Sequence, residues 1–200
     1  VTPTATASIQ PPLKLWYANP AQYFEEALVL GNGLQGATVF GGISTDKIYL
    51  NDLSLWSGEP VNANMNPQAY KNLPAVRKAL QENNYKKAGE LIKKLQGKFS
   101  ESYAPLGTLL MDINDDPYIN DYYRELDIDK AIAKVQTFSN ANTIEREYLV
   151  SNPDKIFTIH LTSKKAGALS FTLRFESLLK HNTITTNNSI QVNGVAPVKA

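Results

Sequence analysis

Residues 28–58 read LVLGNGLQGATVFGGISTDKIYLNDLSLWSG, and this stretch decides the class of fold. Its glycines are dense enough to indicate sharp turns or close approach of backbones, at Gly31, Gly33, Gly36, Gly41 and Gly42. Apolar and β-branched residues fill the gaps between them, as is typical of strands. We therefore predict strands at residues 27–30, 37–40 and 47–50, joined by glycine turns.

The spacing Gly31-x-Gly33-x-x-Gly36 also matches the fingerprint of dinucleotide-binding folds, and Asp52 lies near the place of a ribose-binding acid. Such a site requires the last glycine to open a helix whose N-terminus faces the phosphates. Residues 37–40 are instead β-prone and end at Gly41 and Gly42. We therefore interpret the segment as strands, and we expect no cofactor.

Composition narrows the classes of partner. The 200 residues carry 20 basic and 19 acidic side chains, so no strong charge favours nucleic acid or a membrane surface. Cysteine is absent, which excludes a disulfide, a thiolate metal site and a cysteine nucleophile. The two histidines, His160 and His181, stand in no metal-binding spacing. We expect no metal, no nucleic acid and no membrane partner.

The first twelve residues, VTPTATASIQPP, are small, polar and rich in proline. We expect residues 1–12 to form a disordered tail, of the kind left after removal of a signal peptide or at the boundary of an expressed fragment. This interpretation predicts a secreted or periplasmic protein.

The remaining pattern changes twice along the chain. Residues 66–98 have helical spacing, with Pro74 suited to a first turn and Asn83-Asn84 separating two helices. After Tyr103 the chain returns to strands, and Leu169, Phe171, Leu173 and Phe175 alternate strictly with polar residues. Further strands are predicted at residues 108–113, 133–138, 144–150, 155–161 and 189–192. We predict a mainly β protein, an antiparallel β-sandwich of the super-sandwich type over residues 13–200, with an inserted helical hairpin at about residues 66–98.

Catalytic motifs are weak. There is no G-x-S-x-G elbow, so the sequence gives no support to a serine hydrolase. Glycoside hydrolysis needs two carboxyl groups about 5 to 10 Å apart, a distance that sequence does not reveal. Candidate acids with no favoured pairing are Glu25, Glu26, Asp52, Glu59 and Glu147.

Aromatic side chains are more suggestive, because their faces can pack on the C–H groups of sugar rings. The candidates are Trp16, Tyr17, Trp56, Tyr103, Tyr122 and Tyr123. Trp56 is favoured for its polar neighbours, among them Asn51, although it could equally plug the end of the sandwich or a seam between domains. Asn32, between two glycines, is either a polar contact or a turn residue. The candidate substrate-binding or domain-interface residues are thus Asn32, Asn51 and Trp56.

An ordered set of short blocks resembles the N-terminal domain of glycoside hydrolase family 95, the α-L-fucosidases. The blocks run in the family's order from about residue 13 to residue 175: Leu15-Trp16-Tyr17, Glu26-Ala27-Leu28, Leu30-Gly31-Asn32-Gly33, Gly36-Ala37, Val39-Phe40-Gly41-Gly42, Leu50-Asn51-Asp52, Leu55-Trp56-Ser57-Gly58, Asn66-Pro67, Tyr103-Ala104-Pro105-Leu106-Gly107, Tyr123-Arg124-Glu125-Leu126-Asp127-Ile128-Asp129, Arg146-Glu147-Tyr148 and Ser151-Asn152-Pro153-Asp154. The sequence departs from the family's pattern at Asp52, Ala104 and Thr108.

The resemblance implies a β-sandwich that precedes a catalytic (α/α)6 barrel. In the family, the general acid glutamate and the residues that activate water lie on that barrel, and the reaction inverts the anomeric configuration, which places a water between base and sugar. No catalytic residue is therefore assigned to this chain, which we expect to be an incomplete sandwich without activity of its own. The expected partners are the barrel and a fucosylated glycan.

Three alternatives to an α-L-fucosidase domain remain open at this stage. The parent enzyme could act on α-L-galactosides, because the two sugars differ at one hydroxymethyl group. The chain could be an independent carbohydrate-binding module. It could instead be a purely structural or interaction domain.

Overall fold

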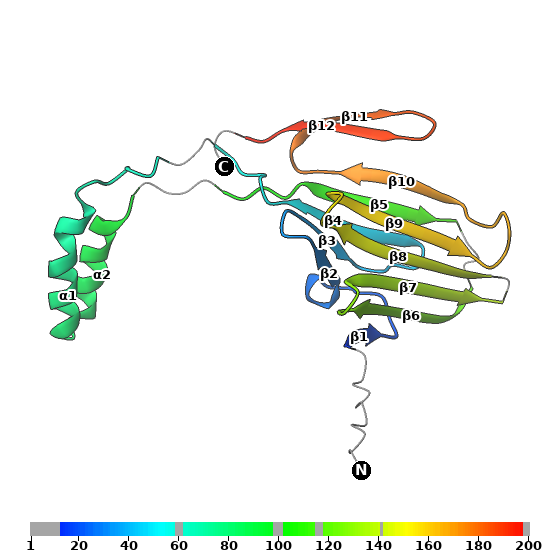
Figure 1. Ribbon diagram of the computed structural model, residues 1–200, viewed down its shortest axis with the longest axis horizontal. Coiled ribbons are helices and arrows are strands. Elements are labelled where there is room, and N and C mark those ends of the chain that lie inside the picture. The colour runs from blue at the N-terminus through cyan, green and yellow to red at the C-terminus, as the bar shows by residue number, and fades with distance from the viewer. Residues whose placement is uncertain (1–12, 59–61, 98–101, 115–117, 141, 198–200) are drawn as a thin grey trace, which may run out of the picture. The chain divides into compact units, whose positions relative to one another are not determined.

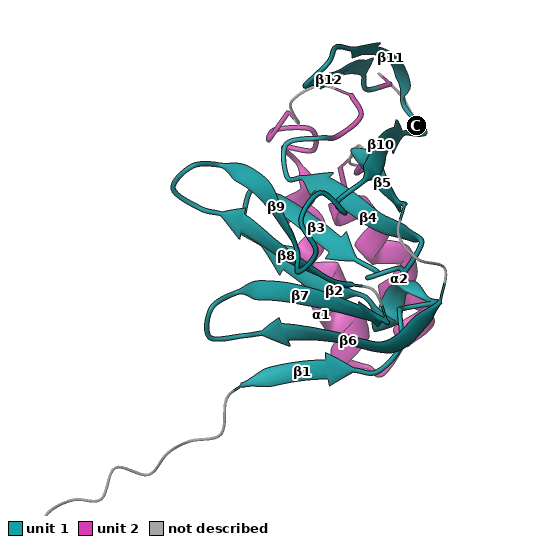
Figure 2. Cartoon of the chain, turned by 90° about the vertical axis from the view of Figure 1, so that its right-hand side faces the viewer, with its two compact units in different colours: residues 1–55, 104–196 teal, residues 56–103, 197–200 magenta. Residues whose placement is uncertain are grey.

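The computed structural model describes residues 13–58, 62–97, 102–114, 118–140 and 142–197. The predicted tail at residues 1–12 and the candidate acid Glu59 lie outside these ranges. The chain divides into two compact units, residues 1–55 with 104–196 and residues 56–103 with 197–200. Figure 2 colours the two units separately.

The first unit contains two five-stranded antiparallel sheets and a hairpin (Figure 1). Sheet A has the order β1-β6-β7-β8-β9 and contains β1 (Lys14–Tyr17), β6 (Ile119–Asp127), β7 (Ile132–Ser139), β8 (Thr143–Ser151) and β9 (Ile156–Ser163). Sheet B has the order β10-β5-β4-β3-β2 and contains β2 (Leu28–Gly31), β3 (Gln35–Val39), β4 (Thr45–Asp52), β5 (Gly107–Ile113) and β10 (Phe171–Glu176). The hairpin pairs β11 (Lys180–Thr185) with β12 (Ile190–Val195).

The core lies between the facing sides of these sheets. Strands β2 and β3 of sheet B lie against β7, β8 and β9 of sheet A. Successive strand residues point to opposite faces, so buried and partly exposed positions alternate along β7 and β8. The core residues are Leu28, Leu30, Ala37, Val39, Ile48, Tyr122, Ala133, Val135, Tyr148 and Val150. The predicted mainly β sandwich is confirmed.

The glycine-rich segment forms consecutive hairpins, as predicted. Strand β2 pairs with β3, and β3 with β4, both antiparallel, so no helix follows Gly36 and the dinucleotide interpretation is correctly rejected. Gly33 takes a φ of +87° in the first turn. In the second turn, a Cβ placed on Gly42 would lie 1.9 Å from the carbonyl oxygen of Thr45, so close backbone approach requires glycine there.

Strand β6 has no counterpart among the strands predicted from the residue pattern. Its inward-facing side chains include Tyr122, Arg124 and Leu126, so a buried arginine interrupts the apolar alternation. Strands β1 and β11 are likewise additional to that prediction, and both are short and rich in polar or exposed side chains. Single-sequence patterning depends on apolar periodicity, which is missing where a strand buries a charge.

The second unit contains the predicted helical hairpin. It comprises η2 (Ala69–Asn72), α1 (Leu73–Gln81), α2 (Tyr85–Ile92) and η3 (Lys93–Leu95), with Pro74 in the first turn of α1. The helices bury Val76, Ala79 and Ala88 against each other, and the Asn84 side chain caps α2 by accepting from the Lys87 amide at 3.1 Å.

The remaining described element is a 3-10 turn of the first unit, η1 (Phe24–Glu26). None of the helices described here is long and apolar enough to span a bilayer.

Candidate functional site

Asn32 is a turn residue that also ties two hairpins together. Its Oδ1 accepts from the amides of Leu34 and Gln35 at 2.9 and 2.7 Å. Its Nδ2 donates to the carbonyl of Ser151 at 2.7 Å, and Asn152 Nδ2 donates to the Asn32 carbonyl at 2.9 Å. Both ends of the Asn32 amide are thus engaged within the sandwich, which gives this side chain a structural role by geometry.

Asn51 lies near the end of β4 and is exposed. It pairs with Gly36 on β3, and a Cβ built on that glycine would lie 3.7 Å from Asn51 Cβ. The missing side chain of Gly36 therefore leaves room for Asn51 to lie against the strand. Asn51 faces away from the core, on the side opposite the inward-facing Ile48.

Trp56 belongs to the second unit, so the three candidate residues are divided between the two units. Its indole is 48% exposed and packs edge to face on Tyr103, with ring centroids 6.0 Å apart. Beside it, buried Ser57 donates its amide to the Ser102 carbonyl at 2.9 Å and accepts from the Ser102 amide at 3.0 Å. Trp56 and Tyr103 form an isolated antiparallel bridge, where the segments that lead into and out of the helical hairpin meet.

Where carboxyl pKa values are shifted in the described part of the chain, the ionised form is favoured. A general acid needs a raised carboxyl pKa. The side-chain carboxyl pKa values that depart from their ordinary range among the described residues are all lowered, at Asp52, Asp112, Glu125, Asp127 and Glu147. In Asp52 the cause is hydrogen bonding from Ser54, and in Glu147 it is first the hydrogen bond from Lys134. These carboxylates are suited to ion pairing rather than to proton donation.

A buried polar cluster joins the two sheets. Asp46 and Arg146 have fully buried side chains, and Arg146 Nη1 lies 3.0 Å from Asp46 Oδ2. Tyr148 donates its hydroxyl to the same carboxylate oxygen, while Oδ1 accepts from the amides of Gly41 and Gly42 at 2.8 and 3.1 Å. Burial raises the pKa of the Tyr148 hydroxyl well above its ordinary value. Because the cluster is closed to solvent, its role is structural.

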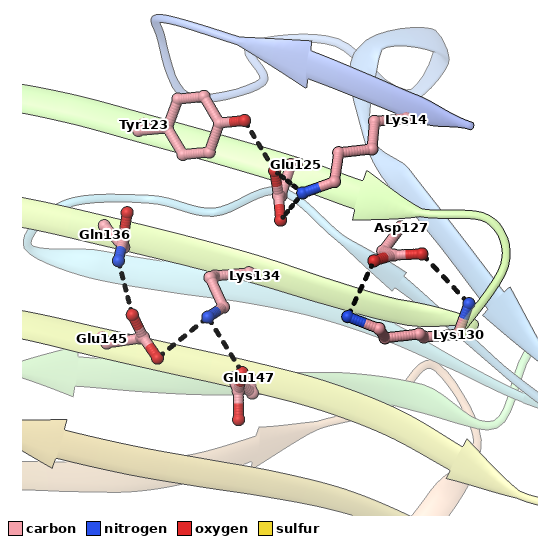
Figure 3. A network of polar contacts seen from close by, with 9 residues as sticks. All are labelled: Lys14, Tyr123, Glu125, Asp127, Lys130, Lys134, Gln136, Glu145 and Glu147. Atoms are coloured by element: carbon pink, nitrogen blue, oxygen red, sulfur yellow. Dashed lines mark hydrogen bonds and ion pairs between the residues drawn. The ribbon is translucent and has the colours of Figure 1, made fainter. Parts of the chain in front are cut away.

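A second polar cluster covers the outer face of sheet A (Figure 3). Glu125 accepts from Lys14 Nζ at 2.9 Å and from the Tyr123 hydroxyl at 2.6 Å. Lys134 Nζ bridges Glu145 and Glu147 at 3.1 and 3.0 Å. Burial raises the pKa of Glu125, but the hydrogen bonds from Tyr123 and Lys14 outweigh it, and the net pKa is lowered. The hydrogen bond to Glu125 in turn raises the pKa of Tyr123 to about 12.

A hollow opens where β1 leads into η1, and we call it the Trp16 hollow. It has a volume of about 500 Å³ and is lined by residues 16–20 with Gln22, Glu26 and Arg124. Trp16 is 64% exposed and stacks on Tyr123 with ring centroids 6.4 Å apart and planes 20° from parallel. Tyr17 covers the guanidinium of Arg124, whose carbon lies 4.1 Å from the ring centroid.

Arg124 holds the walls of the Trp16 hollow together. Its side chain is buried, its Nε donates to the Asn19 carbonyl and its Nη1 to the Glu26 carbonyl, both at 2.7 Å. The Glu26 carboxylate accepts from the amides of Gln22 and Tyr23. Sequence reasoning named Trp16, Tyr17 and Glu26 only among general candidates and missed Gln22 and Arg124, because contacts across 98 residues bring these groups together. Among the described side chains, no three potential metal ligands gather.

The first unit is an antiparallel β-sandwich domain with a polar cluster on one outer face and a hollow beside β1. Domains of this class occur in proteins of many unrelated functions, so the fold alone does not give the function. Comparison with protein families makes the assignment specific. The chain belongs to the family described as glycosyl hydrolase family 65, N-terminal domain, whose model matches residues 15–200. The expected kind of domain is confirmed, while the finer assignment to family 95 stays a prediction.

Named relatives point the same way. The chain is 34% identical over 184 residues to "Alpha-L-fucosidase 2" of Arabidopsis thaliana, covering 90% of this chain and 22% of that protein. It is 30% identical over 161 residues to "Probable alpha-fucosidase A" of Aspergillus niger, covering 76% of this chain and 20% of that protein. A protein of the same name from Aspergillus oryzae is 24% identical over 176 residues, 85% of this chain and 24% of that protein. The chain therefore spans less than a quarter of these relatives.

Proposed function

We propose that this chain is the non-catalytic N-terminal domain of a glycoside hydrolase of family 95 that removes terminal α-L-fucose. The observation that carries the proposal is the similarity to the Arabidopsis α-L-fucosidase, which extends over 90% of this chain and only 22% of that protein. A catalytic (α/α)6 barrel follows the sandwich in the proposed parent, and it supplies the general acid and the water-activating groups of an inverting reaction. The sandwich packs against that barrel.

The lowered carboxyl pKa values support the proposal that the catalytic groups lie on the barrel and not on the sandwich. An inverting hydrolase needs one carboxyl group held protonated beside the leaving oxygen and another that activates water. The shifted carboxyl groups of the described residues, such as Glu125 and Glu147, are instead stabilised in their ionised form by partners such as Lys14 and Lys134. Hydrolysis by this chain alone is therefore not expected.

The test compares two proteins, the 200-residue chain and the longer protein in which the barrel follows it. Both are assayed with p-nitrophenyl α-L-fucoside and p-nitrophenyl α-L-galactoside, and the anomer released is followed by NMR. The expected result is no turnover by the chain alone, and inverting hydrolysis by the longer protein with the fucoside preferred. Turnover by the chain alone, or a longer protein inactive on both substrates, would overturn the proposal. A preference for the galactoside would replace the substrate but keep the family.

The roles of Asn51 and Trp56 are part of the same proposal. We propose that both lie at the rim of the substrate pocket or at the contact with the barrel. In the longer protein, Trp56→Ala is expected to lower either turnover or thermal stability. If both stay at their wild-type values, neither role holds for Trp56. Secretion to the periplasm or outside the cell is also proposed, and fractionation of the producing cells would test it.

A further inference from the structure

We infer that the outer face of sheet A binds a neutral oligosaccharide, which lies across the strands from β1 to β9. Five side chains follow one another across this face, because each is paired with the next in the strand register: Trp16, Glu125, Lys134, Glu147 and His160. We call them the outer row. Neighbouring strands lie about 4.8 Å apart, so the row spans about 19 Å, which is long enough for a short chain of sugar rings. The inference rests on the proposed function only for its choice of sugars.

Trp16 begins the outer row and offers a flat surface to a sugar ring. Its indole is 64% exposed and lies beside the Tyr123 ring, with the two planes 20° from parallel. The Tyr123 hydroxyl donates to Glu125 at 2.6 Å, and Lys14 Nζ donates to the same carboxylate at 2.9 Å. The C–H groups of a pyranose pack favourably on such an aromatic face. Because these contacts hold the aromatic groups in place, binding has little side-chain ordering to oppose it.

Beyond Trp16, the face presents polar groups that are only partly covered. Figure 3 shows Lys134 between Glu145 and Glu147, and Gln136 beside Glu145. An ionised carboxylate can accept about four hydrogen bonds, so the two glutamates can accept from a ligand as well as from their protein partners. His160 ends the row, with its largely exposed ring 3.6 Å from the Glu147 carboxylate. Donors and acceptors therefore alternate along the path that leads away from the indole.

The order of charges along the outer row favours a neutral ligand. Glu125, Lys134 and Glu147 alternate in sign from one strand to the next. A polymer with repeated charges of one sign, such as a nucleic acid or an acidic polysaccharide, would meet a like charge at every second position. A sugar hydroxyl both donates and accepts, so it can bond to a carboxylate and to the neighbouring ammonium group. The chemistry of this face thus fits a chain of uncharged pyranose units.

The experiment uses the 200-residue chain and two trisaccharides that share a lactose core, the neutral 2′-fucosyllactose and the anionic 3′-sialyllactose. Calorimetry and ligand-observed NMR measure binding to the wild-type chain, to Trp16→Ala, to Trp16→Phe and to Tyr85→Ala. Tyr85 is a similarly exposed aromatic residue at the start of α2, so its variant is the matched control. We expect millimolar binding of 2′-fucosyllactose, weakened about tenfold by Trp16→Ala, partly retained by Trp16→Phe and unchanged by Tyr85→Ala. The anionic trisaccharide should bind more weakly than the neutral one.

A second readout locates the sugar and separates binding from folding. Each variant is first shown to unfold at the wild-type urea midpoint. The chain has two tryptophans and hence two indole N–H signals in a nitrogen–proton NMR spectrum, and the signal that Trp16→Phe removes belongs to Trp16. A saturable shift of that signal on adding 2′-fucosyllactose, with the other indole signal unmoved, supports the inference.

Three outcomes would overturn the inference: no binding by the folded wild-type chain, binding that Trp16→Ala leaves unchanged, or tighter binding of the anionic trisaccharide. These outcomes are distinguishable from failure of the proposed function, because they are measured on the 200-residue chain without any hydrolysis. A longer protein that is inactive on both nitrophenyl glycosides would overturn the hydrolase proposal. Trp16-dependent binding of the neutral trisaccharide would still uphold the binding face.

Discussion

Asp46 and Glu125 are both carboxylates paired with a cation in one sandwich, and they differ in where they lie. Asp46 is fully buried between the sheets with Arg146, whereas Glu125 lies on the outer face of sheet A with Lys14, whose side chain is one-third exposed. Water can replace a partner lost at the outer face, but nothing replaces one lost inside. Burial, more than the number of contacts, therefore decides how much the fold depends on such a pair.

The largest expected effect comes from breaking the inner pair. Asp46→Asn leaves the buried Arg146 guanidinium without its counter-charge, so we expect a loss of about 3 to 5 kcal/mol in the free energy of unfolding, measured in urea. Asp112→Asn is the matched control, because Asp112 pairs with the half-exposed Arg174 at 2.7 Å, and its loss should be far smaller than that of Asp46→Asn. Equal losses of unfolding free energy in the two variants would show that burial does not set the contribution of these pairs.

The next effect tests the backbone that supports Asp46. Gly42→Ala places a Cβ 1.9 Å from the Thr45 carbonyl oxygen, so the turn must move. This movement disturbs the hydrogen bond that the backbone amide of residue 42 donates to Asp46. We expect a loss of about 3 kcal/mol in unfolding free energy. The control is Gly33→Ala, in an exposed turn where a Cβ meets nothing within 4 Å, so only the positive φ costs energy, about 1 kcal/mol. A cost at Gly33 equal to or above that at Gly42 would contradict the close-approach argument.

Glu125→Gln tests the outer face, with an expected loss of about 1 kcal/mol at neutral pH. The pKa of Glu125 is lowered from its ordinary value of 4.5, so its contribution is present above pH 4.5 and is lost as the pH falls through the folded-state pKa. As the pH falls below 4.5, the free energy of unfolding of the variant should therefore decrease less than that of the wild type. Unchanged acid dependence in urea unfolding between pH 3 and 7 would count against a stabilising role for this pair.

The smallest effect is expected from Lys134→Met, which removes the cation between Glu145 and Glu147. Burial lowers the pKa of Lys134, but the hydrogen bonds that it donates to Glu147 and Glu145 outweigh this effect, and the net pKa is raised. Its contribution is present below the ordinary value of 10.5 and disappears as the pH rises through the folded-state pKa. We expect a loss of about 0.5 kcal/mol at pH 7 that shrinks in high salt. A salt-independent loss would indicate packing instead of charge.

Much of the fold was predictable because apolar spacing is a local signal. Leu173 and Phe175 in β10, and Val76 and Ala79 in α1, follow the periods of strand and helix, and the structure places them accordingly. Strand β6 was not predicted from this pattern because Arg124 occupies a core-facing position. A charge at such a position is explained only by partners such as the Glu26 carbonyl, which lie far away in sequence.

The candidate site was less predictable than the fold. Asn32 was found by its glycine neighbours, yet its hydrogen bonds to Ser151 and Asn152 depend on a contact across about 120 residues. The Trp16 hollow likewise requires β1 to pair with β6, which no local pattern announces. The sequence shows which residue types are present. The pairing of strands in the sheets decides which of them come close together in space.

The Asp46–Arg146 contact also bears on how the chain folds. The two residues are 100 positions apart, and each belongs to a different sheet, so their bond forms only after both sheets have met. Contacts of such long sequence separation are slow to form, because chain closure costs entropy before any contact energy is gained. Until then both charges keep their water, and an early collapsed state with mispaired sheets would have to bury them unpaired. The pair therefore favours the correctly assembled sandwich over compact states in which the sheets are mispaired.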